Sequence, residues 1–154
     1  MHHFLKWYII YARRGEFMKK LLNSAFAYMI LGLVSGVFYR EYTKIVGFEG
    51  NTTLSVLHTH TLILGMFFFL IATLFAKDLD LERHRKFRRF YLSYHIGLVM
   101  TIVMLFVRGM TQVQGTVLSK GMDAAISGIA GLGHIILTVG MFTFFSMLRE
   151  NIKA

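Results

Sequence analysis

Four long apolar segments, separated by short charged connectors, constrain this chain more than any other feature. They are Leu21–Phe38, Leu54–Ala76, Phe90–Val107 and Ala124–Leu148. A helix needs about 20 residues, within a range of about 17–25, to cross the hydrocarbon core of a bilayer. Each segment meets that requirement, and nothing between them is long enough to fold alone. The sequence therefore predicts an all-α, polytopic membrane protein whose four transmembrane helices form an antiparallel arc or bundle.

The composition excludes several classes of function. Of the 154 residues 55% are hydrophobic and 16% charged, whereas a soluble domain carries about 25% charged residues. The absence of cysteine excludes disulfides, thiolate metal sites, iron–sulfur clusters and cysteine nucleophiles. A net charge of +9 is typical of proteins that bind nucleic acid, but here the charges flank apolar spans. The expected partner is therefore the lipid bilayer and not nucleic acid.

The distribution of basic residues predicts the orientation. The connector between the second and third spans holds six of them, whereas the first and third connectors hold two each. The six are Lys77, Arg83, Arg85, Lys86, Arg88 and Arg89. By the positive-inside rule this connector and both termini are expected to be cytoplasmic.

Residues 1–17 are predicted to be an extension of the transmembrane domain, which comprises residues 18–154. The apolar stretch of the extension is short and no small-residue cleavage site follows it, so it is not a signal peptide. One interpretation is an amphipathic arm at the membrane interface. The preferred interpretation is a translation start at Met18, because the arginine pair at 13–14 can be encoded by a ribosome-binding sequence.

Four histidines lie within the predicted spans. His58 and His60 are in the second, His95 is in the third and His134 is in the fourth. Ionisable groups inside a bilayer are costly, so each is a functional candidate, and the alternative is an interhelical hydrogen bond. A rise of about 1.5 Å per residue places His58 and His60 in the outer part of the membrane. By the same count His134 lies near the middle, within reach of that pair, and His95 lies near the cytoplasmic side.

The spacing of His58 and His60 is informative. A separation of two residues along a helix corresponds to a rotation of about 200°. The two side chains therefore face opposite sides of the helix and are poorly placed to chelate one metal ion. They serve two different sites, or one of them is structural. Gly65 follows His58 on the same face after seven residues and leaves room for a bulky group.

Two charged residues mark the outer ends of the third and fourth spans. Arg108 either reaches to the interface or pairs with carboxylates of a bound cofactor. Asp123 begins the fourth span and is a candidate helix N-cap.

Most of the chain carries a family resemblance. The segments are KKLLNSAFAYMILGLVSGVFYREYTK, LSVLHTHTLILGMFFFL and SKGMDAAISGIAGLGHI. Together they resemble an uncharacterised family of small four-helix bacterial membrane proteins, over nearly everything from Met18 onward. The resemblance implies a location in the bacterial cytoplasmic membrane and supplies no activity.

A second resemblance is local. LHTHTLILGM is similar to the second-helix histidine segment of the catalytic subunit of haem–copper oxidases and nitric oxide reductases, which has three four-helix arcs. The resemblance implies that this chain corresponds to one arc, that a homotrimer rebuilds the whole, and that a low-spin b haem lies between protomers. His58 of one protomer and His60 of its neighbour would be the axial ligands. The other implied cofactor contacts are Gly65, Arg108 and His134, with His95 and Asp123 as weaker candidates.

The chain departs from that subunit in its copper site. It lacks the three further histidines, including an adjacent His-His pair, that hold copper there, so reduction of oxygen or nitric oxide is not expected. Haem b would then serve electron transfer, haem handling or gas sensing. Two alternatives remain open. Ten methionines and the membrane histidines also suit copper transport, and a structural or accessory subunit would use its histidines only for packing.

Overall fold

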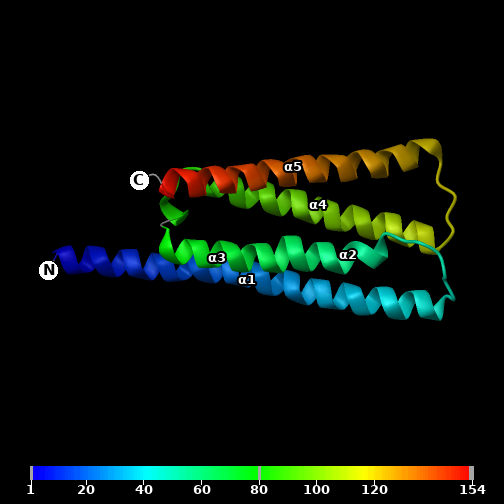
Figure 1. The fold of residues 1–154 in the computed structure, drawn as a ribbon, viewed down its shortest axis with the longest axis horizontal. Helices are drawn as coiled ribbons and strands as arrows, with labels where there is room; N and C mark the ends of the chain where they lie inside the picture. Colours follow the sequence, from blue (N-terminus) through cyan, green and yellow to red (C-terminus); the bar gives the residue numbers. More distant parts are fainter. Residues whose placement is uncertain (1, 80, 153–154) are drawn as a thin grey trace.

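The protein is helical along its whole described length. The computed structural model describes the backbone of residues 2–79 and 81–152, and the side chains of residues 15–79 and 81–152 (Figure 1). No strand occurs in these ranges. The elements in chain order are α1 (His2–Ile45), α2 (Leu54–His60), the π-helix η1 (Thr61–Phe67), α3 (Phe68–Asp78), the short 3₁₀-helix η2 (Leu81–Arg83), α4 (Phe87–Val113) and α5 (Lys120–Ile152).

Four helical segments are long and apolar enough to cross a membrane. They are Gly15–Ile45, Leu54–Asp78, Phe87–Val113 and Lys120–Ile152, which confirms the predicted all-α protein with four transmembrane helices. All four extend beyond the predicted spans. The sequence marks only the apolar part of each helix, whereas helical hydrogen bonding continues into the zone of the lipid headgroups. The 27 residues of α4 correspond to about 40 Å, longer than the hydrocarbon core of about 30 Å.

The N-terminal extension forms no separate element. The backbone from His2 to Phe17 continues α1 without a break, and Figure 1 shows this part projecting beyond the other helices along the same axis. An arm lying in the interface would need a bend before the first span, and α1 has none. The side chains of residues 1–14 lie outside the described part, and the division at residue 17 stays a prediction.

The helices form an open arc. α1 packs against the continuous unit of α2, η1 and α3, that unit packs against α4, and α4 packs along α5. Figure 1 shows the start of α1, the end of α5 and the connection 79–86 at one end, which we call the terminal end. The connections 46–53 and 114–119 lie at the opposite end, which we call the loop end. α1 and α5 are the outer members and do not pack along each other in the described part of the chain.

Glycines set the contact between α1 and the second span. A Cβ atom on Gly32 would lie 2.6 Å from the side chain of Leu62, and one on Gly36 would lie 3.5 Å from Cβ of His58. Small residues allow such close approach of membrane helices. This glycine pair, which has the GxxxG spacing typical of membrane-helix contacts, therefore allows α1 to pack closely on the second span.

The contact between α4 and α5 is closer still and involves main chain on both sides. A Cβ on Gly97 would lie 2.6 Å from Cα of Leu137, and one on Gly140 would lie 2.8 Å from Cα of Tyr94. Gly133 faces Thr101 in the same way, at 3.1 Å. The two backbones touch along about two turns of helix, so any side chain at these glycines would push them apart.

Tyr94 joins α4 to the π-helical segment. Its ring is fully buried and stacks on Phe68 with 3.9 Å between ring centroids. Its hydroxyl donates a hydrogen bond of 2.7 Å to the carbonyl of Leu64 in η1. Segments of π-helix are often found at functional sites, and this one directly follows His60.

We expect Tyr94→Phe to lower the free energy of unfolding by about 1–2 kcal/mol, because the ring packing is kept and only the interhelical hydrogen bond is lost. Unfolding in mixed micelles, followed by circular dichroism, measures this change. Tyr39→Phe is the control, since the Tyr39 hydroxyl has no hydrogen-bond partner among the described residues. Equal stability of the two variants would contradict a stabilising role for the Tyr94 hydroxyl.

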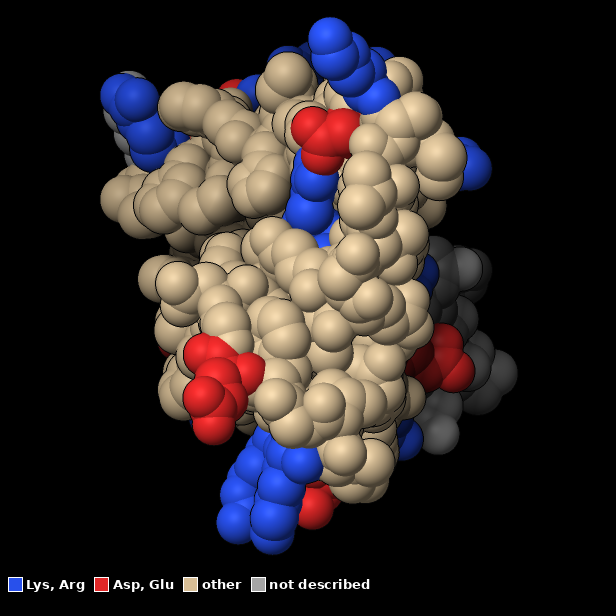
Figure 2. Space-filling model, turned by 90° about the vertical axis from the view of Figure 1, so that its right-hand side faces the viewer, with Lys and Arg blue, Asp and Glu red and all other residues tan. Residues whose placement is uncertain are grey.

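Charge is distributed unequally between the two ends. The basic connector and the lysines that precede the first span lie at the terminal end. At the loop end the charges of both signs are few and lie on a largely uncharged surface (Figure 2), and four of them form the ion pairs Arg40–Glu41 and Arg108–Asp123. The charged residues at this end are Arg40, Glu41, Lys44, Glu49, Arg108, Lys120 and Asp123.

Candidate functional site

His60 and His134 share one hydrogen-bonding arrangement. Nδ1 of His60 lies 2.8 Å from the carbonyl oxygen of Val56, and Nδ1 of His134 lies 2.8 Å from that of Ala130. A carbonyl oxygen can only accept, so Nδ1 donates in both rings, and Nε2 is the nitrogen that a neutral imidazole would offer to a metal. Histidines that ligate a metal almost always donate their other N–H in this way. In both side chains Nε2 has no hydrogen-bond partner among the described residues.

These two histidines lie at similar depths, and α4 supplies the common reference. Gly109 of α4 faces Leu54, and Thr101 faces Gly133. His60 lies six residues from Leu54 towards the terminal end, about 9 Å. His134 lies one residue beyond Gly133, which is level with a position eight residues from Gly109, so it lies about 13 to 14 Å from the same starting level. Their difference in depth is thus about 5 Å. His60 is half-buried and His134 is exposed.

His58 occupies a different environment. It faces α1, where its Cβ would contact a Cβ on Gly36 at 3.5 Å. Its Nδ1 is buried and has no hydrogen-bond partner among the described residues. The predicted opposite orientation of the two neighbouring histidines agrees with this placement, because His58 points to α1 while His60 bonds back to its own helix.

The space beside Gly65 is filled by the chain itself. A Cβ on Gly65 would lie 2.5 Å from Cγ of Tyr28 on α1. The sequence predicted a bulky neighbour at this glycine, and that neighbour is a tyrosine ring. The geometry therefore gives no support to Gly65 as a cofactor contact.

Arg108 is engaged with α5. Its guanidinium forms an ion pair with the carboxylate of Asp123 and donates a hydrogen bond of 2.7 Å to Oγ of Ser127. The predicted N-cap role of Asp123 is wrong, because α5 begins at Lys120 and Ser119 Oγ accepts from the amide of Met122. The proximity of Arg108 to Asp123 was expected from their position at one end of the molecule, but the sequence did not predict their pairing.

His95 is the centre of a polar cluster between α1 and α4. Nδ1 of His95 lies 2.8 Å from the hydroxyl of Tyr28, and Nε2 lies 3.4 Å from Oγ of Ser24. Ser24 also bonds to the hydroxyl of Tyr91 at 2.9 Å, and the imidazole stacks on Phe69 with 4.6 Å between centroids. From the sequence, His95 was a candidate without predicted partners. The pattern that indicates them is that Ser24 and Tyr28, like Tyr91 and His95, are four residues apart and so share a helix face.

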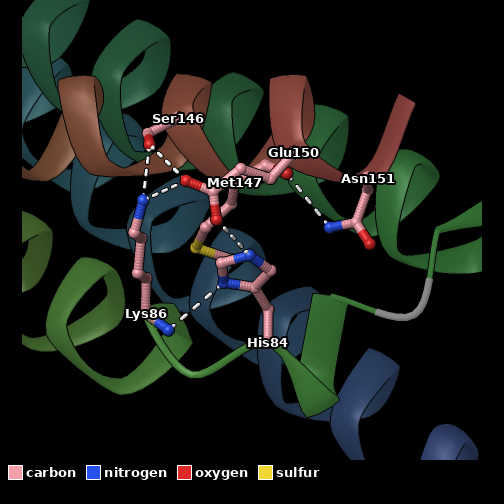
Figure 3. Close-up of polar contacts among 6 residues, drawn as sticks. All are labelled: His84, Lys86, Ser146, Met147, Glu150 and Asn151. Carbon is pink, nitrogen blue, oxygen red and sulfur yellow. Dashed lines mark hydrogen bonds and ion pairs between the residues drawn. The ribbon is translucent and has the colours of Figure 1, made fainter. Parts of the chain in front are cut away.

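A second polar cluster lies at the terminal end and joins the basic connector to α5 (Figure 3). His84 Nε2 lies 3.0 Å from Oε2 of Glu150. Lys86 forms an ion pair with the same carboxylate and donates a hydrogen bond of 2.8 Å to Ser146. The side chain of His84 is only 13% exposed, so this histidine of the basic connector is packed against α5 and is not simply solvated. This cluster fastens the end of the fourth span.

The described residues contain no group of three or more His, Cys, Asp or Glu side chains that could hold a metal ion. The copper-transport interpretation therefore gains no preformed site. A haem needs only one or two axial donors, because its porphyrin supplies the other ligands. The pair of preoriented imidazoles is thus the best-defined candidate site within the membrane helices.

The fold and the sites together define a four-helix, multi-pass membrane protein with histidines placed inside its spans. Residues 18–151 match the family described as "Protein of unknown function (DUF2871)". The chain belongs to this family, which confirms the resemblance to uncharacterised small four-helix membrane proteins. No match was found among the curated proteins or among the solved structures. The local resemblance to haem–copper oxidases accordingly gains no support from these comparisons.

Proposed function

We propose that this protein is an integral membrane haem-b-binding protein, with Nε2 of His60 and Nε2 of His134 as the axial ligands. The observation that carries the proposal is the pair of Nδ1 hydrogen bonds at 2.8 Å, which orient both rings with Nε2 available as a ligand atom. Neutral imidazole is a suitable ligand for iron. A bis-histidine haem is low-spin and supplies one-electron transfer.

The environment of His134 also fits a flat cofactor. A Cβ on Gly128 or Gly131 would meet no atom within 4 Å, so the loop-end half of α5 presents a smooth and uncovered surface. In the most apolar stretch of α5 only 17% of the residues are buried, whereas 28–33% are buried in the corresponding stretches of the other three spans. We infer that this surface is covered in the assembled protein, with the haem lying between chains of a homotrimer. The axial pair then differs from the pair implied by the oxidase resemblance, in which His58 replaces His134.

The experiment is an absorption spectrum of the detergent-purified protein, expressed with 5-aminolevulinic acid and recorded oxidised and then reduced with dithionite. A Soret band, sharp α and β bands on reduction, and a haem b pyridine haemochrome are the expected results. A flat spectrum would overturn the proposal. In that case, copper measured by mass spectrometry would favour the transport interpretation, and a metal-free protein would favour an accessory subunit.

We further propose that the terminal end faces the cytoplasm of a bacterium and that the protein resides in its inner membrane. The support is the basic connector at that end, since positively charged connectors are retained in the cytoplasm. Two exposed positions distinguish the ends, namely Thr116 at the loop end and Asp78 at the terminal end. Because the chain has no cysteine, each can carry a single reporter thiol without removal of others.

In intact spheroplasts, we expect a membrane-impermeant maleimide to label Thr116→Cys, whereas Asp78→Cys should react only after the membrane is permeabilised. The physical reason is that the reagent reaches only the side opposite the basic connector. The labelled fraction is read from the gel shift of a polyethylene-glycol maleimide. The reverse pattern would place the basic connector outside and contradict the proposed orientation.

A further inference from the structure

A polar cavity opens between α1 and α4 near the terminal end, and neither haem ligation nor the ion pairs account for it. Its volume is about 590 Å³. It is lined by Glu16, Lys19, Lys20, Asn23, Ser24, Ala27, Tyr28, Tyr91 and His95. The charged side chains come from the first turns of this stretch of α1, nearest the terminal end, and the groups beyond them are hydroxyls, an amide and an imidazole.

The hydrogen bonds in this cavity leave one donor weakly engaged. Ser24 Oγ donates to the carbonyl of Lys20 at 3.0 Å and so accepts from Tyr91 at 2.9 Å. If the hydroxyl of Tyr28 donates to Nδ1 of His95 at 2.8 Å, Nε2 carries the proton. That proton has only the long contact of 3.4 Å to Ser24. An N–H of His95 is therefore available to an acceptor entering the cavity.

An apolar cavity of about 450 Å³ continues along the same two helices towards the loop end. Its lining includes Leu31, Val34 and Phe38 of α1 and Val99, Val103 and Phe106 of α4. Leu31 lies one helical turn beyond Tyr28, and Val99 lies one turn beyond His95. The seam between α1 and α4 thus has a polar cavity followed by an apolar one, and the hydrogen bond between Tyr28 and His95 lies between the two.

We propose that this seam binds an isoprenoid quinone or quinol, with the ring in the polar cavity and the tail in the apolar one. The ring oxygens would accept from His95 and exchange hydrogen bonds with Ser24 and Tyr91.

Depth favours this ligand class over a phospholipid. His95 lies eight residues after the start of α4, which is about 12 Å along the helix from the terminal end. It is therefore deeper in the membrane than the level at which a lipid phosphate would meet the lysines. The deep donors Ser24, Tyr28 and His95 match an uncharged acceptor and not a phosphate. A single apolar channel also accommodates one tail and not two.

The test is a titration of the full-length, detergent-solubilised protein with decylubiquinone, followed by the shift in its thermal unfolding temperature. Co-purified quinone is measured separately by organic extraction and chromatography. We expect Ser24→Ala and His95→Gln to weaken binding by about tenfold or more, the effect of losing one well-placed polar contact. Ser93→Ala is the matched control, because Ser93 lies on the opposite face of α4 and bonds to its own helix.

His95→Gln also alters packing, so Tyr91→Phe is the second variant, which keeps the ring and removes only the hydroxyl. Its unfolding temperature without ligand shows that the fold is intact, and weaker quinone binding is again expected. Binding unchanged in Ser24→Ala and Tyr91→Phe would overturn the proposal, as would equal stabilisation by palmitate or phosphatidylglycerol. The titration is independent of haem content, so a colourless protein that binds quinone would refute only the haem proposal.

Discussion

His60→Ala and His134→Ala are each expected to abolish the low-spin haem spectrum. Both rings hold Nε2 free through an Nδ1 hydrogen bond to a carbonyl four residues earlier, and an axial ligand cannot be replaced by a methyl group. We expect the haem content of the purified protein to fall by at least about tenfold, since even a lost second-shell partner of a ligand costs about 10–100-fold in metal affinity. The pyridine haemochrome assay measures this content.

Two further histidine variants serve as controls. His58→Ala removes an imidazole that packs on α1, and His84→Ala removes one that bonds to Glu150 at the terminal end. Both should retain the haem spectrum. Loss of haem in His58→Ala together with its retention in His134→Ala would overturn the assigned pair and favour the pair implied by the oxidase resemblance.

Co-expression of the two ligand variants tests whether the haem lies between chains. A mixed assembly contains sites in which an intact His60 of one chain meets an intact His134 of its neighbour. Partial recovery of the spectrum is therefore expected, although neither variant binds haem alone. No recovery, in assemblies shown by differential tags to contain both variants, would place both ligands in one chain and contradict the interface.

Gly97→Ala is expected to destabilise the helical domain by about 2–3 kcal/mol. The added methyl group would meet the main chain of Leu137 and the carbonyl of Gly133 at 2.9 Å. A backbone cannot move aside as a flexible side chain does, so α4 and α5 must separate, and overpacking of this kind costs about 1–3 kcal/mol or more. Reversible unfolding in mixed micelles measures the change.

Gly15→Ala on α1 is the control, because a Cβ there meets no atom within 4 Å and the position lies outside the surface of α5 that we propose to be covered. Alanine favours the helix over glycine by about 1 kcal/mol, so this variant should be as stable as the parent protein or more so. A loss of stability equal to that of Gly97→Ala would contradict close packing of α4 on α5 as the cause.

The number and type of the helices were predictable because a bilayer imposes one length and one composition on each span. The contact at Gly32 and Gly36 was predictable for the same kind of reason, since a GxxxG spacing places both glycines on one face. Their lengths beyond the apolar core were not predictable, because polar helix ends such as Lys120–Asp123 resemble loop sequence. The π-helical winding of Thr61–Phe67 also could not be predicted from the sequence, since these residues suit an α-helix equally well.

The histidines could be recognised as candidates from the sequence because they lie in apolar spans. Their hydrogen-bond partners could not be predicted, because these depend on how the helices pack. Asp123 illustrates this limit, because its proximity to a helix start was evident while its pairing with Arg108 depends on the rotation of α4 against α5. The filling of the Gly65 notch by Tyr28 depends in the same way on α1. Contacts between helices that are far apart in the sequence therefore determine which of the candidate residues are free to bind a ligand. The local sequence around each residue does not.

The π-helical segment fixes the relative rotation of the two halves of the second span. Its hydrogen bonds reach one residue further than those of an α-helix, so it accommodates one residue more than regular winding would. A one-residue deletion within Thr61–Phe67 that restores regular winding would therefore leave His60 and Phe68 in about the same relative rotation, whereas the same deletion from an ordinary α-helix would turn one half by about 100° against the other. The segment thus makes the direction of the histidine tolerant of a change in length at this point of the span.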